Sequence, residues 1–398
     1  LEVLKTAVMF GADAVYIGGE AFGLRAKAKN FSMEDMKEGV QFAHEHGARV
    51  HVTVNILAHN DDLEGAAEYL KELKEIGPDA LIIADPAIFM LAKEICPEIE
   101  RHVSTQANNT NYGTFNFWWN LGAKRVVTAR ELSLKEIREI RAHIPAEMEI
   151  ESFIHGAMCI SYSGRCLLSN FFTGRDANQG ACTHPCRWKY SVVEETRPGE
   201  YMPVYENERG TYIFNSKDLC MIEHIPEMID AGIDSFKIEG RMKTALYVAT
   251  VARTYRKAID DYLEDPKKYE ANMPWYRDQI SNCTYRQFTT GFYFGKPGDE
   301  SQIYDSNTYI KEYTYLGIIG GIKDGMYRIE QRNKFSVGET VEIMKPDGQN
   351  VEVTVEKIVD EDGQEQESAP HPKQVLYVAL SGEASVYDIL RRQEGVTE

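Results

Sequence analysis

The stretch GARVHVTVNILAHNDDLEGAAEYLKELKEIGPDALIIA, residues 47–84, contains a strand, a helix and a second strand. The apolar run Val50–Ile56 is typical of a buried strand, whereas the apolar residues of Leu63–Ile76 recur with helical spacing. Gly77 and Pro78 end the helix, and Ala80–Ala84 begins the next strand. This order predicts two parallel strands joined by a crossover helix.

The same alternation continues through the first 240 residues. We expect strands at Asp13–Gly18, Val50–Ile56, Ala80–Ala84, Val103–Gln106, Arg125–Ala129, Glu149–Ile154, Tyr212–Asn215 and Ser235–Ile238. Eight such strands predict an α/β fold, a closed (β/α)8 TIM-like barrel, over residues 1–300. No Gly-x-Gly-x-x-Gly follows any of them, which argues against a dinucleotide-binding sheet.

The sequence pattern changes near residue 305. A long helical pattern at 241–265 is followed by prolines and then by short β-type runs. Pro346-Asp347-Gly348 is typical of a hairpin turn, and the acidic stretch 360–372 predicts a loop. We expect a small C-terminal all-β domain, barrel-like in form, over residues 305–398.

The composition is that of a globular chain with an acidic surface. The 398 residues carry a formal net charge of −18, which on average repels nucleic acid. Arg253, Arg256 and Lys257 form a weak candidate RNA-binding patch, for which a solvated helix face is the simpler explanation. No run of 18 apolar residues and no signal peptide is present, so we expect a cytoplasmic protein without membrane contact. Because Leu1 lies inside a helical pattern, we also expect earlier residues to be missing from this numbering.

Cysteines are crowded after the sixth predicted strand. The chain has seven, an odd number that argues against a disulfide framework. Four of them fall within residues 159–186, which we term the cysteine segment: Cys159, Cys166, Cys182 and Cys186. Four thiolates at the catalytic face of a barrel predict a zinc site or an iron–sulfur cluster, and the spacing does not decide between them. Cys220, after the seventh strand, is an alternative fourth ligand, and simple burial of small thiols is the structural alternative.

Polar residues follow most of the predicted strands, where a barrel places its active site. Any one of them could instead cap the next helix. As a set, their cations predict a pocket for a small anionic ligand, since guanidinium groups make paired contacts with carboxylates. The candidate catalytic residues are His155, Lys237 and Glu239, and the candidate substrate-binding residues are Asn55, Gln106, Arg130, Lys217 and Arg241.

The run from Glu151 to Ser169 resembles the signature of peptidase family U32, the collagenase-like peptidases. It contains Glu-x-Phe-x-x-Gly-Ala-apolar-Cys, followed by Gly-x-Cys and a serine. The resemblance covers nearly the whole chain, and further matching motifs lie at 11–16, 104–108, 130–133, 178–180, 186–188, 215–219, 237–241 and 333–338. Members usually begin with a strand that is absent here, which supports the expectation of missing N-terminal residues.

Within this family, the chain is similar to proteins implicated in prephenate-dependent hydroxylation of the wobble uridine of tRNA to 5-hydroxyuridine. The resemblance implies tRNA as partner, prephenate as co-substrate and a 4Fe–4S cluster as cofactor. Carried over by position, the first three cluster ligands are Cys159, Cys166 and Cys182. The fourth differs among relatives, and of Cys186 and Cys220 we favour Cys186.

Two other functions stay open at this point. The family name implies a peptidase, for which His155 near Cys159 is the only obvious base and nucleophile. No Gly-x-Ser-x-Gly or His-Glu-x-x-His motif supports that function. The third alternative is a non-catalytic RNA-binding protein with a structural zinc site, against which the position of the cysteines argues.

Overall fold

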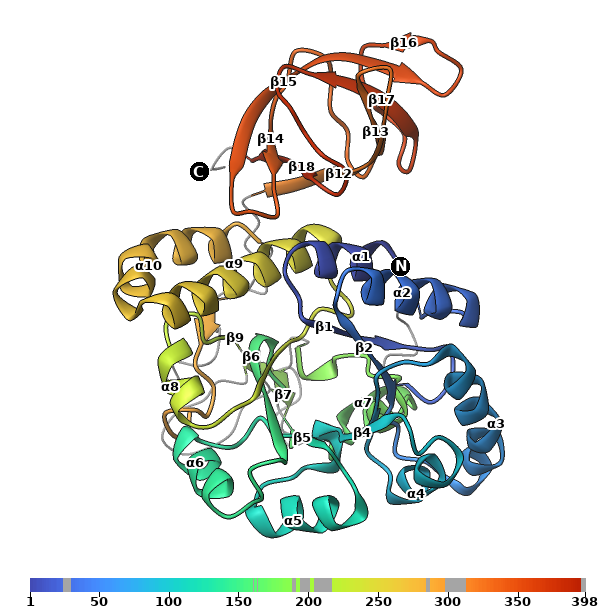
Figure 1. Ribbon diagram of the computed structural model, residues 1–398, viewed down its shortest axis with the longest axis vertical. Helices are drawn as coiled ribbons and strands as arrows, with labels where there is room; N and C mark the ends of the chain where they lie inside the picture. The colour runs from blue at the N-terminus through green and yellow to red at the C-terminus, as the bar shows by residue number, and fades with distance from the viewer. Residues whose placement is uncertain are drawn as a thin grey trace. The chain divides into compact units, whose positions relative to one another are not determined.

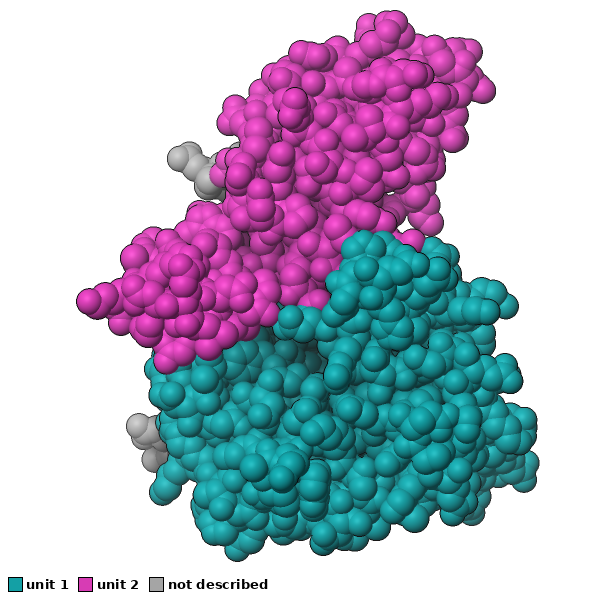
Figure 2. All heavy atoms as spheres, viewed as in Figure 1, with its two compact units in different colours: residues 1, 13–242, 286–308 teal, residues 2–12, 243–285, 309–398 magenta. Residues whose placement is uncertain are grey.

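A computed structural model describes residues 1–23, 30–159, 161–162, 164–187, 191–193, 201–203, 217–283, 287–297 and 313–394. The chain forms two compact units (Figure 2). The first consists of residue 1 with 13–242 and 286–308, and the second of 2–12, 243–285 and 309–398. Every helix of the described residues is too short or too polar to cross a membrane.

Six parallel strands of the first unit pair in sequence order. They are β1 (Ala14–Gly18), β2 (Arg49–Val54), β3 (Ala80–Ile83), β4 (Glu100–Val103), β5 (Arg125–Val127) and β6 (Glu149–Ala157). The helices that surround these strands in Figure 1 are α2 (Met33–Glu45), α3 (Asn60–Ile76), α4 (Pro86–Ile95), α5 (Tyr112–Leu121), α6 (Leu134–Ala142) and α8 (Ile225–Asp230). The predicted α/β fold, a TIM-like barrel, is confirmed.

The helix boundaries follow the local signals of the sequence. The Ser32 hydroxyl accepts a hydrogen bond from the Asp35 amide, and Ser133 forms a capping box with Glu136. Gly77 ends α3 in the left-handed conformation, at φ 72°. These caps bring the chain back into the next strand and so keep the strand–helix rhythm regular.

The barrel departs from the predicted strands at two places. The predicted fourth strand, 103–106, is β4 at Glu100–Val103, because the Ser104 hydroxyl accepts from the Gln106 amide and begins the short helix η1 (Thr105–Ala107). The predicted seventh strand, 212–215, lies outside the described residues. Three strands complete the sheet: β9 (Asp218–Cys220), β10 (Ser235–Ile238) and β11 (Phe288–Thr289).

These three strands attach to the sheet through β6. β10 pairs directly and in parallel with β6, β9 pairs antiparallel with the last residues of β6, and β11 pairs with β9. The side chains of β10 and β1 meet inside the barrel, where Lys237 Nζ lies 4.4 Å from the centroid of the Tyr16 ring. The cysteine segment after β6 forms α7 (Leu168–Thr173), η2 (Ala177–Gln179) and η3 (Pro185–Arg187), and β7 (Ser191–Val193) pairs with β8 (Tyr201–Pro203).

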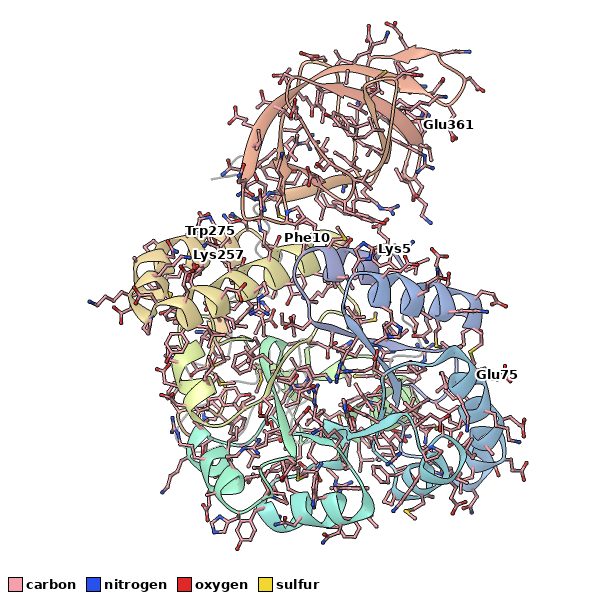
Figure 3. The ribbon with its side chains drawn as sticks, in the orientation of Figure 1. Lys5, Phe10, Glu75, Lys257, Trp275 and Glu361 are labelled. Carbon is pink, nitrogen blue, oxygen red and sulfur yellow. The ribbon has the colours of Figure 1, made fainter. Side chains whose placement is uncertain are left out.

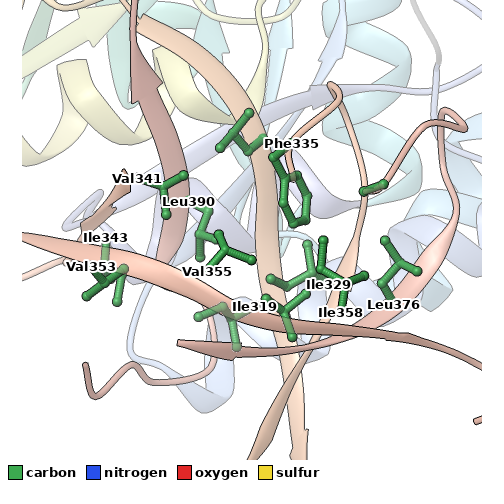
Figure 4. Close-up of a cluster of buried hydrophobic side chains, with 13 residues drawn as sticks. Ile319, Ile329, Phe335, Val341, Ile343, Val353, Val355, Ile358, Leu376 and Leu390 are labelled. Carbon is green, nitrogen blue, oxygen red and sulfur yellow. The ribbon is translucent and has the colours of Figure 1, made fainter. Parts of the chain in front are cut away.

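The second unit contains an all-antiparallel sheet and three helices. The predicted all-β C-terminal domain is confirmed, with strands β12 (Tyr313–Lys323), β13 (Met326–Glu330), β14 (Thr340–Met344), β15 (Asn350–Asp360), β16 (Glu365–Gln366), β17 (Val375–Leu380) and β18 (Ile389–Gln393). Its core is a cluster of aliphatic side chains around Phe335 (Figure 4). β16 lies within the stretch 360–372 that was predicted as a loop, because Gln366 pairs with Ile358 of β15.

The helices of this unit are α1 (Glu2–Met9), α9 (Ala245–Glu264) and α10 (Pro266–Ser281). α9 matches the long helix predicted at 241–265, but it groups with the C-terminal strands rather than with the barrel. A second apolar cluster explains this grouping, because Leu246 and Ala249 of α9 pack with Phe10, Ile318 and Met344. Figure 3 labels Phe10 near the start of the chain and Lys257 and Trp275 on the helices α9 and α10.

Candidate active site

A cavity of about 170 Å³ opens among the carboxyl ends of the barrel strands. Residues that follow β2, β4, β5, β6 and β10 line it, as expected for a barrel active site. Of the predicted site residues, the cavity brings together Asn55, Gln106, Arg130, Lys237, Glu239, Arg241, Cys159, Cys166, Cys182 and Cys186.

Three cations of this cavity are held in different ways. The Arg130 guanidinium lies over the Phe153 ring at 3.9 Å and approaches Glu239 to 3.7 Å. Arg241 reaches from the end of β10 to the Thr53 hydroxyl at 3.4 Å, and a β-carbon at Gly18 would overlap its guanidinium. The Phe153 ring positions the Arg130 guanidinium, and Thr53 positions that of Arg241, so two planar donor forks of the kind that pair with carboxylates lie at the cavity.

The third cation, Lys237, is fixed by a buried carboxylate. Its Nζ donates to Glu151 Oε1 at 2.6 Å, and both side chains are more than 90% buried. The other oxygen of Glu151 accepts from Arg125 at 2.8 Å and from the Ser235 hydroxyl at 2.9 Å. Burial alone would raise the pKa of Glu151, but the Lys237 and Arg125 cations hold that pKa well below its usual range.

Two histidines share the barrel interior with this network. Burial, followed by the neighbouring His102, lowers the pKa of His51 to about 3. Burial likewise lowers the pKa of His102, against the pull of Glu100 Oε2 at 3.1 Å. Both rings are therefore neutral at pH 7, so the cations that balance the negative charge of Glu151 are Arg125 and Lys237.

The cysteine segment is held over the cavity by polar contacts. Within it, the Ser169 hydroxyl bonds the Thr183 hydroxyl at 2.9 Å, and the Asn178 side chain donates to the Cys166 carbonyl at 3.0 Å. Its Asn178 carbonyl accepts from the Leu57 amide at 3.2 Å, which ties the segment to the loop after β2. Gly164, at φ 72°, allows close approach to the Gln106 carbonyl, which a β-carbon there would overlap.

The four cysteines of the segment all line the cavity, whereas Cys220 lies on β9 and is not among the lining residues. Cys159 is exposed as a residue, but protein atoms packed near its thiol raise the pKa of that thiol, and the Cys166 and Cys182 thiols add to the rise. Among the described residues, no three potential ligands converge closely enough to hold a single metal ion. Four cysteines that line one cavity are nevertheless a ligand set that either zinc or an iron–sulfur cluster could use.

Two predicted site residues lie elsewhere. His155 is buried on β6, with its ring 5.6 Å from that of Phe288, and does not line the cavity with Cys159. Lys217 precedes β9 and does not line the cavity either. Of the base–nucleophile pair expected for a cysteine peptidase, only Cys159 lines the cavity.

Sequence reasoning missed the buried network of Glu151, Arg125, His51 and His102. Each lies within a strand of the barrel, and none of the four lines the cavity. The available signal was Glu151 in the middle of a predicted barrel strand, because a buried carboxylate needs a buried cation.

A family model described as "Peptidase family U32" matches residues 1–303, and one described as "Peptidase family U32 C-terminal domain" matches residues 311–391. The chain is 43% identical to "tRNA hydroxylation protein P1" of Bacillus subtilis, over 98% of this chain and 92% of that protein. It is 38% identical to "tRNA hydroxylation protein P" of Escherichia coli, over 93% and 89%. A 23S rRNA 5-hydroxycytidine synthase of Escherichia coli is 40% identical over 66% of this chain and 38% of its own length.

Proposed function

The chain belongs to peptidase family U32. Because two relatives that match it over most of their length are named tRNA hydroxylation proteins, we propose that it is a tRNA-modifying enzyme. The reaction is prephenate-dependent hydroxylation of the wobble uridine to 5-hydroxyuridine. Its cofactor is a 4Fe–4S cluster on Cys159, Cys166, Cys182 and Cys186.

One observation carries this proposal: four cysteines and three cations line the same cavity. Neither set alone distinguishes an enzyme from a structural metal site. Together they combine a ligand set for a redox cofactor with an anion site at the catalytic face of a barrel. A structural zinc site has no need of an adjoining anion pocket.

The cations of the cavity suit a dicarboxylate such as prephenate. Arg130 and Arg241 carry planar donor forks, and the stacking of Arg130 on Phe153 fixes the direction of its fork. Lys237 Nζ adds a point charge at the floor, oriented by Glu151. The amides of Asn55 and Gln106 supply neutral donors at the same mouth, and Asn55 is itself oriented by a hydrogen bond to Ser104 at 3.1 Å.

The bound cluster would supply redox and Lewis-acid chemistry beside this anion site. The chain's own part is to bind and orient the co-substrate and to limit the access of water. Glu239 approaches the Arg130 guanidinium to 3.7 Å, so it balances one cation of the pocket and keeps a carboxylate near the reacting groups. We assign it as the candidate group that accepts or returns a proton there.

The cofactor assignment is tested by visible absorption of the anaerobically purified protein. We expect brown protein, a large loss of absorption and bound iron in Cys186→Ser, and wild-type absorption and iron in Cys220→Ser. Cys220 is the matched control, since it is another partly buried cysteine of the barrel unit. Colourless protein with one equivalent of zinc would refute the cluster, and loss of absorption in Cys220→Ser alone would move the fourth ligand.

The substrate assignment is tested by nucleoside analysis of tRNA from a strain that lacks this protein and any redundant pathway. We expect 5-hydroxyuridine to disappear and to return with the wild-type gene. An Arg130→Ala gene should not restore it, because the anion site loses a fixed guanidinium. Unchanged wobble-uridine hydroxylation in the deletion strain would refute the proposed function.

A further inference from the structure

The outer side of the cysteine segment is apolar although it faces solvent. Phe171 is 82% exposed, Leu167 is 70% exposed, and Tyr162 and Phe172 are exposed as well. The buried side chain of α7 is instead a polar one, Ser169. A helix that buries its serine and exposes its aromatic rings is inverted relative to an ordinary surface helix, and clustered exposed apolar side chains mark interaction sites.

This exposure is built into the segment, because polar contacts hold the inner side of α7. The Thr183 amide donates to the Ser169 hydroxyl at 3.0 Å, and the Thr173 hydroxyl donates to the Ser169 carbonyl at 2.7 Å. Phe171 and Phe172 meet edge to face, with ring centroids 5.2 Å apart. The outer aromatic rings therefore form a prearranged surface on a helix that is anchored from below.

The charge of the segment is opposite to that of the whole chain. Residues 159–186 contain two arginines and one aspartate, in a chain with a net charge of −18. Arg165 and Arg175 are exposed beside the apolar side chains. The one carboxylate, Asp176, already accepts a hydrogen bond from the Asn178 amide at 2.7 Å. The segment thus offers a polyanion a local basic site within a chain that is acidic overall.

The same surface reaches the rim of the cavity. Tyr162 is exposed and also lines the cavity, and Leu168 of α7 lines it from the neighbouring position. The Arg165 amide donates to the Tyr162 carbonyl at 3.0 Å, so one turn links the rim tyrosine to an exposed arginine. We name the surface of Tyr162, Arg165, Leu167, Phe171, Phe172 and Arg175 the aromatic ledge.

We propose that the aromatic ledge binds the unpaired bases that flank the target nucleotide of a single-stranded RNA loop. Unstacked bases stack on exposed aromatic rings and arginines, and nearby guanidinium groups bind the phosphates between them. The ledge lies beside the cavity, so neighbouring bases held there would deliver one nucleotide to it. This inference rests on the proposed function, since it names where the RNA substrate is held.

The test compares RNA binding by the full-length protein and by Phe171→Ala/Phe172→Ala. The probes are an anticodon stem-loop RNA and a fully paired RNA duplex of the same length. We expect the Kd for the stem-loop to rise at least about fivefold in the double variant, as loss of one base–aromatic stack predicts. Duplex binding should not change. In Arg165→Gln/Arg175→Gln, the salt dependence of stem-loop binding should fall by roughly one unit for each phosphate that an arginine no longer neutralises.

Phe117→Ala is the matched control, because Phe117 is 52% exposed on α5 and is not among the residues that line the cavity. It should bind both RNAs like the wild type. The inference is overturned if wild-type protein does not prefer the stem-loop, or if the double variant binds the stem-loop normally. In either case the exposed rings would instead be a contact surface for another protein.

Binding and turnover separate this inference from the proposed function. If the protein has no hydroxylation activity but its stem-loop binding depends on Phe171 and Phe172, the proposed function is refuted and the RNA-binding role of the aromatic ledge is retained. Normal hydroxylation and normal stem-loop binding by the double variant would refute the ledge and keep the function.

Discussion

Glu151 is a buried carboxylate of the barrel interior with three side-chain partners. Its carboxylate satisfies Lys237, Arg125 and Ser235 at once, at distances between 2.6 and 2.9 Å. A buried ion pair contributes little net stability, since removing both charges from water is costly. Removing one partner is strongly destabilising, however, because it leaves the other charges buried and unpaired. Its role is to fix where Lys237 points.

Glu151→Gln should lower the free energy of unfolding by about 3–5 kcal/mol, because it leaves buried cations without their counter-charge. Chemical denaturation at pH 7 measures the change. Glu149→Gln is the control, because Glu149 also pairs with Arg125 but its side chain is 26% exposed, so water can partly replace the lost partner and the loss of stability should be smaller. Equal effects of the two substitutions would contradict this account of Glu151.

His51 predicts how the unfolding free energy depends on pH. Its folded pKa of about 3 lies below the ordinary value, so the folded state stays neutral while the unfolded chain takes up a proton below pH 6.5. Stability from this residue is full above pH 6.5 and falls as the pH drops from there towards 3. The slope is about 1.4 kcal/mol per pH unit.

Denaturant unfolding between pH 4.5 and 6.5 checks this slope, a window that we choose to lie above the titration of most carboxylates. His51→Gln should make the slope shallower by about 1.4 kcal/mol per pH unit, the contribution of one proton. An unaltered slope in His51→Gln would show that this ring is not kept neutral in the folded protein.

At the scale of single elements, the sequence could predict what is local and not what is paired at long range. Strand–helix alternation and the caps at Ser32 and Ser133 are readable because they depend on neighbouring residues. The direct pairing of β10 with β6, and the antiparallel return of β9, depend on contacts across many tens of residues. The crowding of the cysteines can be read from the sequence, but the hydrogen bond that anchors their segment to Leu57 cannot.

The close approach of the cysteine segment to the Gln106 carbonyl requires glycine at position 164, because a β-carbon there would overlap that carbonyl. Gly164→Ala should displace the segment from the Gln106 carbonyl and so lower the iron bound after anaerobic reconstitution, measured as iron per protein. Gly174→Ala separates strain from overlap, because Gly174 also has a positive φ, 65°, but has open space around it. That control should cost only about 1–2 kcal/mol of backbone strain and keep its iron. Equal iron contents in the two variants would contradict this role for Gly164.

At the scale of the whole molecule, the second unit joins segments that are distant in the sequence. The change of rhythm near residue 305 marks where the strands become antiparallel, but it cannot reveal which helices pack on them. The guanidinium of Arg332 pairs with Glu2 of α1, and the Tyr315 hydroxyl donates to the same carboxylate at 3.1 Å. The basic helix face considered for RNA is also accounted for, since Arg256 pairs with Asp260 and Lys257 with Asp261.

Arg253 is the central link of this unit. It is 2% exposed, and its guanidinium donates to the Lys345 carbonyl at 2.8 Å, to Asn350 Oδ1 at 3.0 Å and to the Gln279 side chain at 2.5 Å. One residue of α9 therefore satisfies acceptors on α10 and on the turn between β14 and β15. A lysine has no planar fork and cannot reach all three.

Arg253→Lys should therefore lower the free energy of unfolding of the full chain by about 1–3 kcal/mol for each buried acceptor left unpaired. Amide hydrogen exchange should rise in the β14–β15 turn first, because that turn loses its donor while the aliphatic core around Phe335 stays intact. Arg256→Lys, three residues along the same helix, keeps its charge beside Asp260 at the surface and should change stability by no more than about 0.5 kcal/mol. If both lysine variants unfold alike, α9 is not tied to the C-terminal strands through Arg253, and the apolar contacts of Leu246 and Ala249 alone must hold it there.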